Sequence, residues 1–137
     1  MKPIEVGERI PSATVSRLEN GKPVAFDVQD ALRGRTVVLF ALPGAFTPTC
    51  SAAHLPRYEE LFDSFQAAGV DEILCVSVND AFVMDAWGRA QGVNRVTLVA
   101  DGNAELSRGT GLLVDKSDLG FGPRSWRYAL VIEDDYD

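Results

Sequence analysis

A cysteine near the start of a predicted helix is the residue best suited to carry chemistry in this chain. It is Cys50, the last residue of the run PGAFTPTC over 43–50. Thr47 is a suitable N-cap, and Pro48 suits the first helical position because its missing N–H costs nothing there. At the third position, unpaired N–H groups and the helix dipole favour a thiolate, the nucleophilic form of cysteine. A structural cysteine in the first turn of an ordinary helix would produce the same pattern.

Buried strands alternate with helices along the sequence, and they determine where this cysteine lies. Strands are predicted at 13–18, 23–26, 36–42, 72–78, 95–100 and 126–133, and helices at 27–32, 48–68, 80–90 and just after 101–103. The turn signal Asn20-Gly21 joins the first two strands into a hairpin. The alternation predicts an α/β fold. Cys50 follows the first central strand, and functional groups collect at the carboxyl ends of strands in such sheets.

Composition limits the classes of function. The chain has 137 residues, which is one domain, and a net charge of −7. The acidic balance and the lack of a basic run argue against nucleic-acid binding. No apolar stretch reaches membrane-spanning length, and residues 1–10 do not resemble a secretory signal. Two cysteines cannot form a disulfide framework, so we expect a cytoplasmic protein without a membrane partner.

Four separated motifs resemble the peroxiredoxins, and the type-5 class in particular. They are the run 43–51 with HLP at 54–56, the stretch 75–84 with WGRA at 87–90, LVADG at 98–102, and RYALV at 127–131. The resemblance covers nearly the whole chain in the expected order. Four motifs in register are a more specific signal than the spacing Pro43-x-x-x-Thr47-x-x-Cys50 alone.

The resemblance implies a thioredoxin-like α/β fold with an N-terminal β-hairpin extension and a central mixed sheet flanked by helices. It implies a thiol peroxidase that reduces hydrogen peroxide and alkyl hydroperoxides without a metal or other cofactor. Cys50 would become a sulfenic acid, Thr47 would hydrogen-bond the peroxide, Arg127 would stabilise thiolate and peroxide, and Pro43 would shield the site. It also suggests a homodimer packed near the active-site loops. Without the resemblance, Arg127 reads as a surface arginine on an edge strand.

Two further residues have chemical potential, and a plainer role suits each better. His54 lies four residues after Cys50, so the two share a helical face. A metal pair lacks further ligands, and a catalytic Cys–His dyad is also conceivable, but packing or hydrogen bonding near the site fits His54 better. Cys75 lies in a predicted buried strand and is expected to act as a small apolar residue rather than as a partner for Cys50.

The sequence also departs from the family pattern. Some type-5 peroxiredoxins carry a resolving cysteine near the C-terminus, and none occurs here. We therefore expect a one-cysteine mechanism, with glutathione and glutaredoxin or thioredoxin as reductant. Residues 1–137 are expected to form one domain that lacks the family's last strand and helix.

Two other functions remain open on the same fold. A thiol–disulfide oxidoreductase of the thioredoxin type usually carries Cys-x-x-Cys, and Thr47 occupies the first of those positions here. A redox-sensing or chaperone module would need a partner that the sequence does not name.

Overall fold

The computed structural model describes residues 2–48 and 54–133, so Cys50 lies outside the described residues. The strands are β1 (Thr14–Glu19), β2 (Lys22–Asp27), β3 (Thr36–Ala41), β4 (Glu72–Ser77), β5 (Thr97–Ala100), β6 (Leu113–Asp115), β7 (Pro123–Ser125) and β8 (Tyr128–Glu133). The helices are α1 (Val28–Leu32), α2 (Leu55–Glu60), α3 (Phe62–Ala67), α4 (Ala81–Ala90), α5 (Glu105–Gly109) and the short 3₁₀ helix η2 (Ser117–Leu119). None of the helices in the described residues has the length and apolar character needed to cross a membrane.

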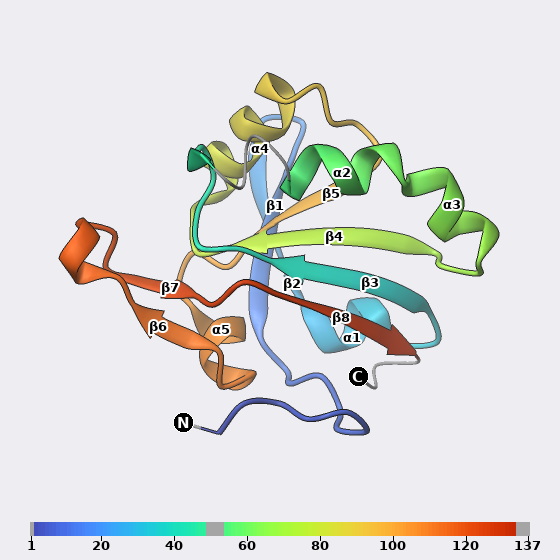
Figure 1. Ribbon diagram of the computed structural model, residues 1–137, viewed down its shortest axis with the longest axis horizontal. Coiled ribbons are helices and arrows are strands. Elements are labelled where there is room, and N and C mark those ends of the chain that lie inside the picture. Colours follow the sequence, from blue (N-terminus) through green and yellow to red (C-terminus); the bar gives the residue numbers. More distant parts are fainter. Residues whose placement is uncertain (1, 49–53, 134–137) are drawn as a thin grey trace.

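The described strands form one mixed sheet in the order β2-β1-β5-β4-β3-β8, with β6 and β7 as a separate hairpin (Figure 1). Strands β3, β4 and β5 run parallel, whereas β8 pairs antiparallel with β3. The predicted N-terminal hairpin is present, since β1 pairs with β2 around Asn20 and Gly21. The carboxyl ends of β3 and β4 therefore meet at one edge of the sheet, and the Pro43–Pro48 segment begins there.

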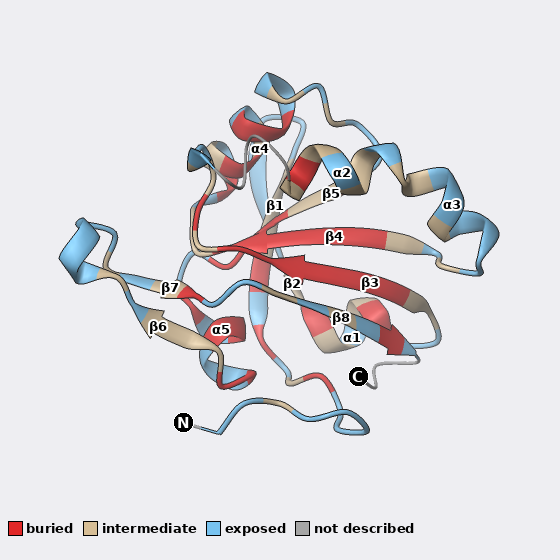
Figure 2. Ribbon diagram, viewed as in Figure 1, coloured by how far each residue is buried: buried red, intermediate tan, exposed pale blue. Residues whose placement is uncertain are grey.

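Strand β3 is buried on both faces, as its unbroken apolar run predicts (Figure 2). Val37, Leu39 and Ala41 point to one face, where they pack with residues of α1 and α5. Val38 and Phe40 point to the other face, where they pack with α2 and α4, including the buried Trp87. The sheet is thus a central layer between two helical layers, which fixes the end of β3 in place.

Acidic side chains begin three of the helices. Asp27 accepts hydrogen bonds from the backbone N–H groups that follow it in α1, and Asp80 accepts one from Val83 N–H in α4. The sequence predicted helices that begin at both of these residues. Asp101 is fully buried and accepts from Leu106 N–H, Ser107 N–H and the Ser107 hydroxyl. Burial raises the pKa of Asp101, although these hydrogen bonds act in the opposite direction.

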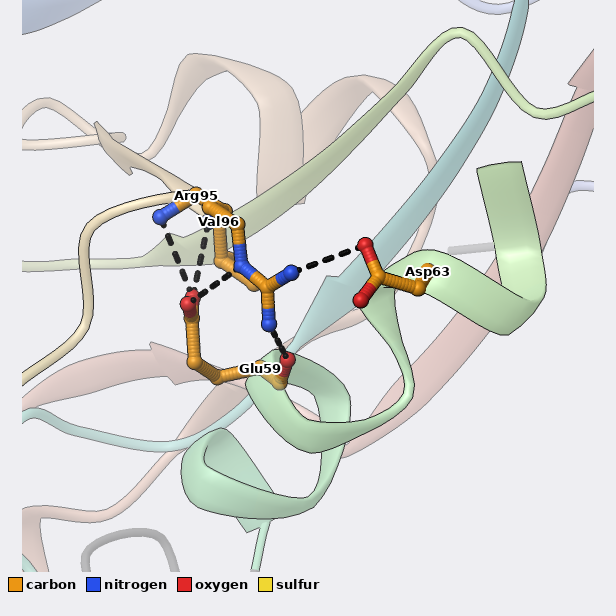
Figure 3. A network of polar contacts seen from close by, with 4 residues as sticks. All are labelled: Glu59, Asp63, Arg95 and Val96. Atoms are coloured by element: carbon orange, nitrogen blue, oxygen red, sulfur yellow. Dashed lines mark hydrogen bonds and ion pairs between the residues drawn. The ribbon is translucent and has the colours of Figure 1, made fainter. Parts of the chain in front are cut away.

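The long helix predicted over 48–68 is interrupted. Its described part consists of α2 and α3, with Leu61 between them at φ −88° and ψ 3°. The break coincides with a side chain from outside the helix: Arg95 Nη2 donates to the Glu59 carbonyl at 2.9 Å (Figure 3). A side chain that occupies a carbonyl of the helical hydrogen-bond ladder is a known cause of kinks.

The hairpin of β6 and β7 was not predicted from the sequence. Each strand has only three residues, and the connection contains Gly120 and Gly122, both at positive φ. The predicted strand over 126–133 begins later than expected, at Tyr128. Trp126 and Arg127 therefore form a connection between β7 and β8, close to the carboxyl end of β3 in Figure 1.

Candidate active site

The site is built on the segment that leaves the carboxyl end of β3. Leu42 N–H continues the sheet by donating to Val76 C=O at 3.2 Å. The chain then turns through Gly44 and Phe46, and Pro48 is already helical. This agrees with the expected helix start at Pro48, two residues before Cys50 in the sequence.

The β4–α4 connection holds this segment through Asn79. Ala45 N–H donates to Asn79 Oδ1 at 3.0 Å, and the buried Ser77 hydroxyl donates to the same oxygen at 2.7 Å. Two donors converge on one atom, so it must be the amide oxygen. The amide therefore links the ends of two neighbouring parallel strands and limits the movement of the segment.

Thr47 lies half-buried within the segment, and its hydroxyl is committed to a backbone carbonyl. Thr47 Oγ1 donates to Gly44 C=O at 2.7 Å. A hydroxyl carries one proton and two lone pairs, so the oxygen still has acceptor capacity after this bond. The geometry gives Thr47 the ability to accept a hydrogen bond from a ligand.

Phe46 adopts an unusual backbone conformation. Its φ is +64°, and its side chain is 55% exposed. A bulky residue in the left-handed region is a conformational outlier that the surrounding contacts must maintain, and such outliers cluster at functional sites. The bonds of Ala45 and Thr47 on either side supply those contacts.

Strand β7 contacts the same segment from the late part of the chain. The buried Ser125 hydroxyl donates to Leu42 C=O at 3.3 Å. Arg124 Nη1 donates to Pro43 C=O at 3.2 Å. Two residues of β7 thus hold the carbonyls of Leu42 and Pro43, although more than 80 positions separate each pair in the sequence. Arg127 lies two residues beyond Ser125.

Arg127 lies against the N-terminal end of α2. Its Nη1 is 2.8 Å from Nδ1 of His54. A guanidinium has only donors, so Nδ1 must be the acceptor, and the ring is neutral with its proton on Nε2. Burial, reinforced by the positive charge of Arg127, lowers the pKa of His54. The predicted hydrogen-bonding role of His54 near the site is consistent with this contact.

Aromatic rings fix the orientation of the imidazole. The Phe40 and Tyr58 rings stack at 3.9 Å between centroids, and the His54 ring lies 5.1 Å from Phe40 and 5.6 Å from Tyr58. Phe40 is fully buried in β3. The position of Arg127 is therefore tied, through the imidazole, to the central strand.

The predicted site residues fall into two groups that share the end of β3. Pro43 and Thr47 lie in one segment, and Arg127 contacts His54 at the start of α2, whereas Cys50 lies outside the described residues. Cys75 is buried in β4, beside Phe40 in the sheet register, as expected for a small apolar residue. The described residues contain no cluster of three or more metal-ligating side chains.

Sequence reasoning missed the residues that hold the segment in place. These are Asn79, Arg124 and Ser125. Asn79 lies within the 75–84 motif but was given no role in the site, and no local signal distinguishes an arginine in a three-residue strand from a surface arginine. The bulky residue at positive φ, Phe46, also carries no sequence signal.

Comparison with known families and proteins adds to this geometry. The Redoxin family profile matches residues 5–136. The chain is 63% identical over 101 residues to peroxiredoxin sll1621 of Synechocystis, covering 74% of this chain and 53% of that protein. It is 47% identical over 127 residues to the hybrid peroxiredoxin hyPrx5 of Haemophilus influenzae, covering 93% and 53%. The chain thus spans about half the length of these curated relatives.

A solved structure of reduced Prx3 from Vibrio vulnificus in complex with H₂O₂ superposes with a TM-score of 0.93. It shares 48% sequence identity and covers 97% of this chain and 84% of that one. The likeness confirms the predicted fold class, a thioredoxin-like α/β fold with a central mixed sheet flanked by helices.

Proposed function

We propose that this chain, which belongs to the Redoxin family and has peroxiredoxins as relatives, is a thiol-dependent peroxidase acting through Cys50. The observation that carries the proposal is the arrangement at the end of β3. Thr47, three residues before Cys50, has a hydroxyl with free acceptor capacity, and the Arg127 guanidinium contacts His54, four residues after Cys50. Hydrogen peroxide and alkyl hydroperoxides are the proposed substrates.

The reaction is a displacement at oxygen. The Cys50 thiolate attacks one peroxide oxygen, and the O–O bond breaks with its electron pair on the other oxygen. That oxygen takes a proton and leaves as water or alcohol, while the sulfur becomes a sulfenic acid. Sulfur is oxidised by two electrons and the peroxide is reduced by two, so the step needs no metal or other cofactor.

The flanking residues would favour this displacement by electrostatics. Negative charge moves from sulfur to the departing oxygen, and donors fixed along that path stabilise the transition state more than the ground state. The guanidinium of Arg127 presents a rigid fork of donors. Thr47 would accept a hydrogen bond from the peroxide O–H. Pro43, half-buried at the head of the segment, would exclude water.

The proposed reductant is an external thiol, either glutathione with glutaredoxin or thioredoxin. Complete burial of Cys75 supports this proposal, because a buried thiol cannot reach a sulfenic acid without rearrangement of β4. Two cysteines in a 137-residue chain also fit a reducing, cytoplasmic setting. We expect glutathione to give a mixed disulfide at Cys50 after one equivalent of peroxide. An intramolecular Cys50–Cys75 bond in the mass spectrum would contradict the one-cysteine mechanism.

The proposed assembly is a homodimer that packs near the site. Apolar side chains exposed in neighbouring connections support it: Phe46 is 55% exposed and Trp126 is 51% exposed. Sedimentation should give a dimer, and Phe46→Asn, which tolerates the positive φ, should shift the protein towards monomer. A wild-type monomer at high protein concentration would contradict the assembly.

The test of function is a stopped-flow reaction of the reduced protein with hydrogen peroxide and with an alkyl hydroperoxide. Cys50→Ser is the essential comparison, and Cys75→Ser is the matched control. We expect fast oxidation that yields one sulfenic acid per chain, is lost in Cys50→Ser and is retained in Cys75→Ser. Oxidation no faster than that of a free thiol would overturn the proposal.

A further inference from the structure

Arg124 is a half-buried arginine whose position the proposed chemistry does not explain. Its Nε donates to Phe121 C=O at 3.1 Å, its Nη1 donates to Pro43 C=O at 3.2 Å, and its guanidinium carbon lies 5.2 Å from the Phe121 ring centroid. Burial lowers its pKa. Among the described residues no carboxylate forms an ion pair with it, so backbone carbonyls and an aromatic ring determine where it lies.

The absence of a side chain at Gly44 permits this approach. A Cβ built on Gly44 would lie 2.9 Å from Arg124 Nη1 and 3.2 Å from Cγ2 of Thr47. Gly44 does not have a positive φ, so its backbone conformation is open to any residue. The need for glycine here is therefore steric, because the guanidinium and the threonine methyl group occupy the space on one side of it.

Gly44 also connects Arg124 with Thr47 through adjacent carbonyl groups. The carbonyl of Pro43 accepts from Arg124, and the carbonyl of Gly44 accepts from the Thr47 hydroxyl at 2.7 Å. The Arg124 contact holds the peptide before Gly44, and Asn79 holds the peptide after it through Ala45 N–H, so the two contacts together limit the direction of the Gly44 carbonyl. That carbonyl determines where the Thr47 proton points, and thus where its lone pairs point.

We infer that Arg124 is a positioning residue, which aligns the Thr47 hydroxyl by holding the Pro43–Gly44 peptide against β7. The inference rests on the proposed function, in which the Thr47 hydroxyl accepts a hydrogen bond from the peroxide. Without Arg124 the segment keeps its other ties at Ala45 and Leu42. The fold should therefore survive, while the hydroxyl loses its alignment.

The expected effect is on rate. A misplacement of about 1 Å at a reacting group can lower a rate roughly a hundredfold. We expect Arg124→Gln to lower the second-order rate constant with hydrogen peroxide by about ten- to a hundredfold. Arg33→Gln is the matched control, since Arg33 is an exposed arginine with a surface ion pair to Asp30. It should leave the rate unchanged.

A double-mutant cycle with Thr47→Val tests whether Arg124 acts through Thr47. If it does, the Arg124→Gln change should have little further effect once the hydroxyl is gone, because the two losses are not additive. A merely structural role would lower the rate by the same factor in both backgrounds. Thermal unfolding of all four proteins checks that each is folded at the assay temperature.

Gly44→Ala provides a second route if Arg124→Gln fails to fold. Its methyl group would collide with the guanidinium without removing any charge. Its effect on the rate should also disappear in the Thr47→Val background. Equal fold-losses with and without the Thr47 hydroxyl, or no loss at all, would overturn the inference while leaving the peroxidase proposal intact. A wild-type protein no faster than a free thiol would overturn both.

Discussion

Two arginines hold opposite ends of α2, and they do so with different partners. Near its C-terminal end, Arg95 donates to the carboxylates of Glu59 and Asp63 and to the Glu59 carbonyl, and it lies 5.0 Å from the Phe62 ring centroid (Figure 3). At the other end, Arg127 contacts the neutral imidazole of His54. Both contacts fix a guanidinium, but the contacts with Glu59 and Asp63 place negative charge beside it, whereas the contact with His54 is to a neutral ring nitrogen.

The difference distinguishes a structural arginine from one suited to chemistry. Hydrogen bonding to Glu59 raises the pKa of Arg95; burial acts in the opposite direction, and the hydrogen bond to Asp63 adds to the increase. An imidazole nitrogen supplies an acceptor and a direction without supplying a negative charge. A contact of this kind suits an arginine that stabilises a departing oxygen anion, because it orients the guanidinium without itself adding negative charge.

The largest expected effect is on the rate, at Arg127. Arg127→Gln should lower the rate constant with hydrogen peroxide by about 10²- to 10³-fold, as found when one preorganised donor is removed from an oxyanion site. Arg95→Gln should leave that rate nearly unchanged and lower the thermal midpoint instead. Stopped-flow oxidation and thermal unfolding of both variants test the contrast. Similar rate losses in the two variants would remove the distinction between the arginines.

The next effect is on stability, at Glu59. Its side chain is only 16% exposed and accepts from Arg95 N–H, Arg95 Nε and Val96 N–H. Glu59→Gln keeps the shape but loses the charge, and it should lower the free energy of unfolding by about 1–2 kcal/mol. Urea denaturation measures this. Glu60→Gln, at an exposed neighbour whose side chain is 67% accessible, is the control.

The same residue gives a pH dependence with a defined sign. Burial alone would raise the pKa of Glu59, but the hydrogen bonds from Val96 and Arg95 outweigh it and lower the pKa below 4.5. As the pH falls, the unfolded chain therefore takes up this proton first. The stabilisation from the Glu59 carboxylate is fully present above about pH 4.5, and it is lost as the pH falls through the lower pKa of Glu59 in the folded state. Glu59→Gln should show a flatter stability curve in that range.

The comparison also shows what sequence can and cannot reveal. The buried β3 strand and the helix starts at Asp27 and Asp80 rest on local patterns, and the structure confirms them. The interpretation of the Cys50 run also rests on a local pattern, and it stays a prediction. The break at Leu61 coincides with a contact from Arg95, 36 residues from Glu59, and Pro43 is held by Arg124, 81 residues away. Contacts at such separations leave no periodicity or spacing in the sequence.

The hairpin of β6 and β7 was missed for the same physical reason. A strand of three residues is too short to show an alternating pattern, and Pro123 at its start argues against a strand. The residues that this hairpin contributes to the site become identifiable only when the fold brings them to the end of β3. Local sequence therefore provided the candidate for the reacting group, while tertiary structure identified the residues that hold the segment preceding it.

The smallest expected effect concerns His54 and acid. Its pKa is lowered from 6.5 by burial and then by Arg127, so the unfolded chain binds this proton before the folded one does. The contribution of His54 to the free energy of unfolding is fully present above about pH 6.5, and it is lost as the pH falls towards the lower pKa of His54 in the folded state. Protonation also removes the acceptor at Nδ1 and places two positive charges side by side, so the peroxide rate should fall within the same range.

His54→Asn separates this effect from the titration of Cys50. Asparagine retains an acceptor close to the position of Nδ1 but does not titrate, so we expect its rate at neutral pH to stay within about tenfold of wild type. Its acid limb should then follow the Cys50 thiolate alone, which absorbance at 240 nm monitors independently. If the wild-type rate already tracks the thiolate fraction at every pH, the imidazole has no influence on Arg127. The contrast between an arginine held by acids and one held by a neutral ring would then concern stability only.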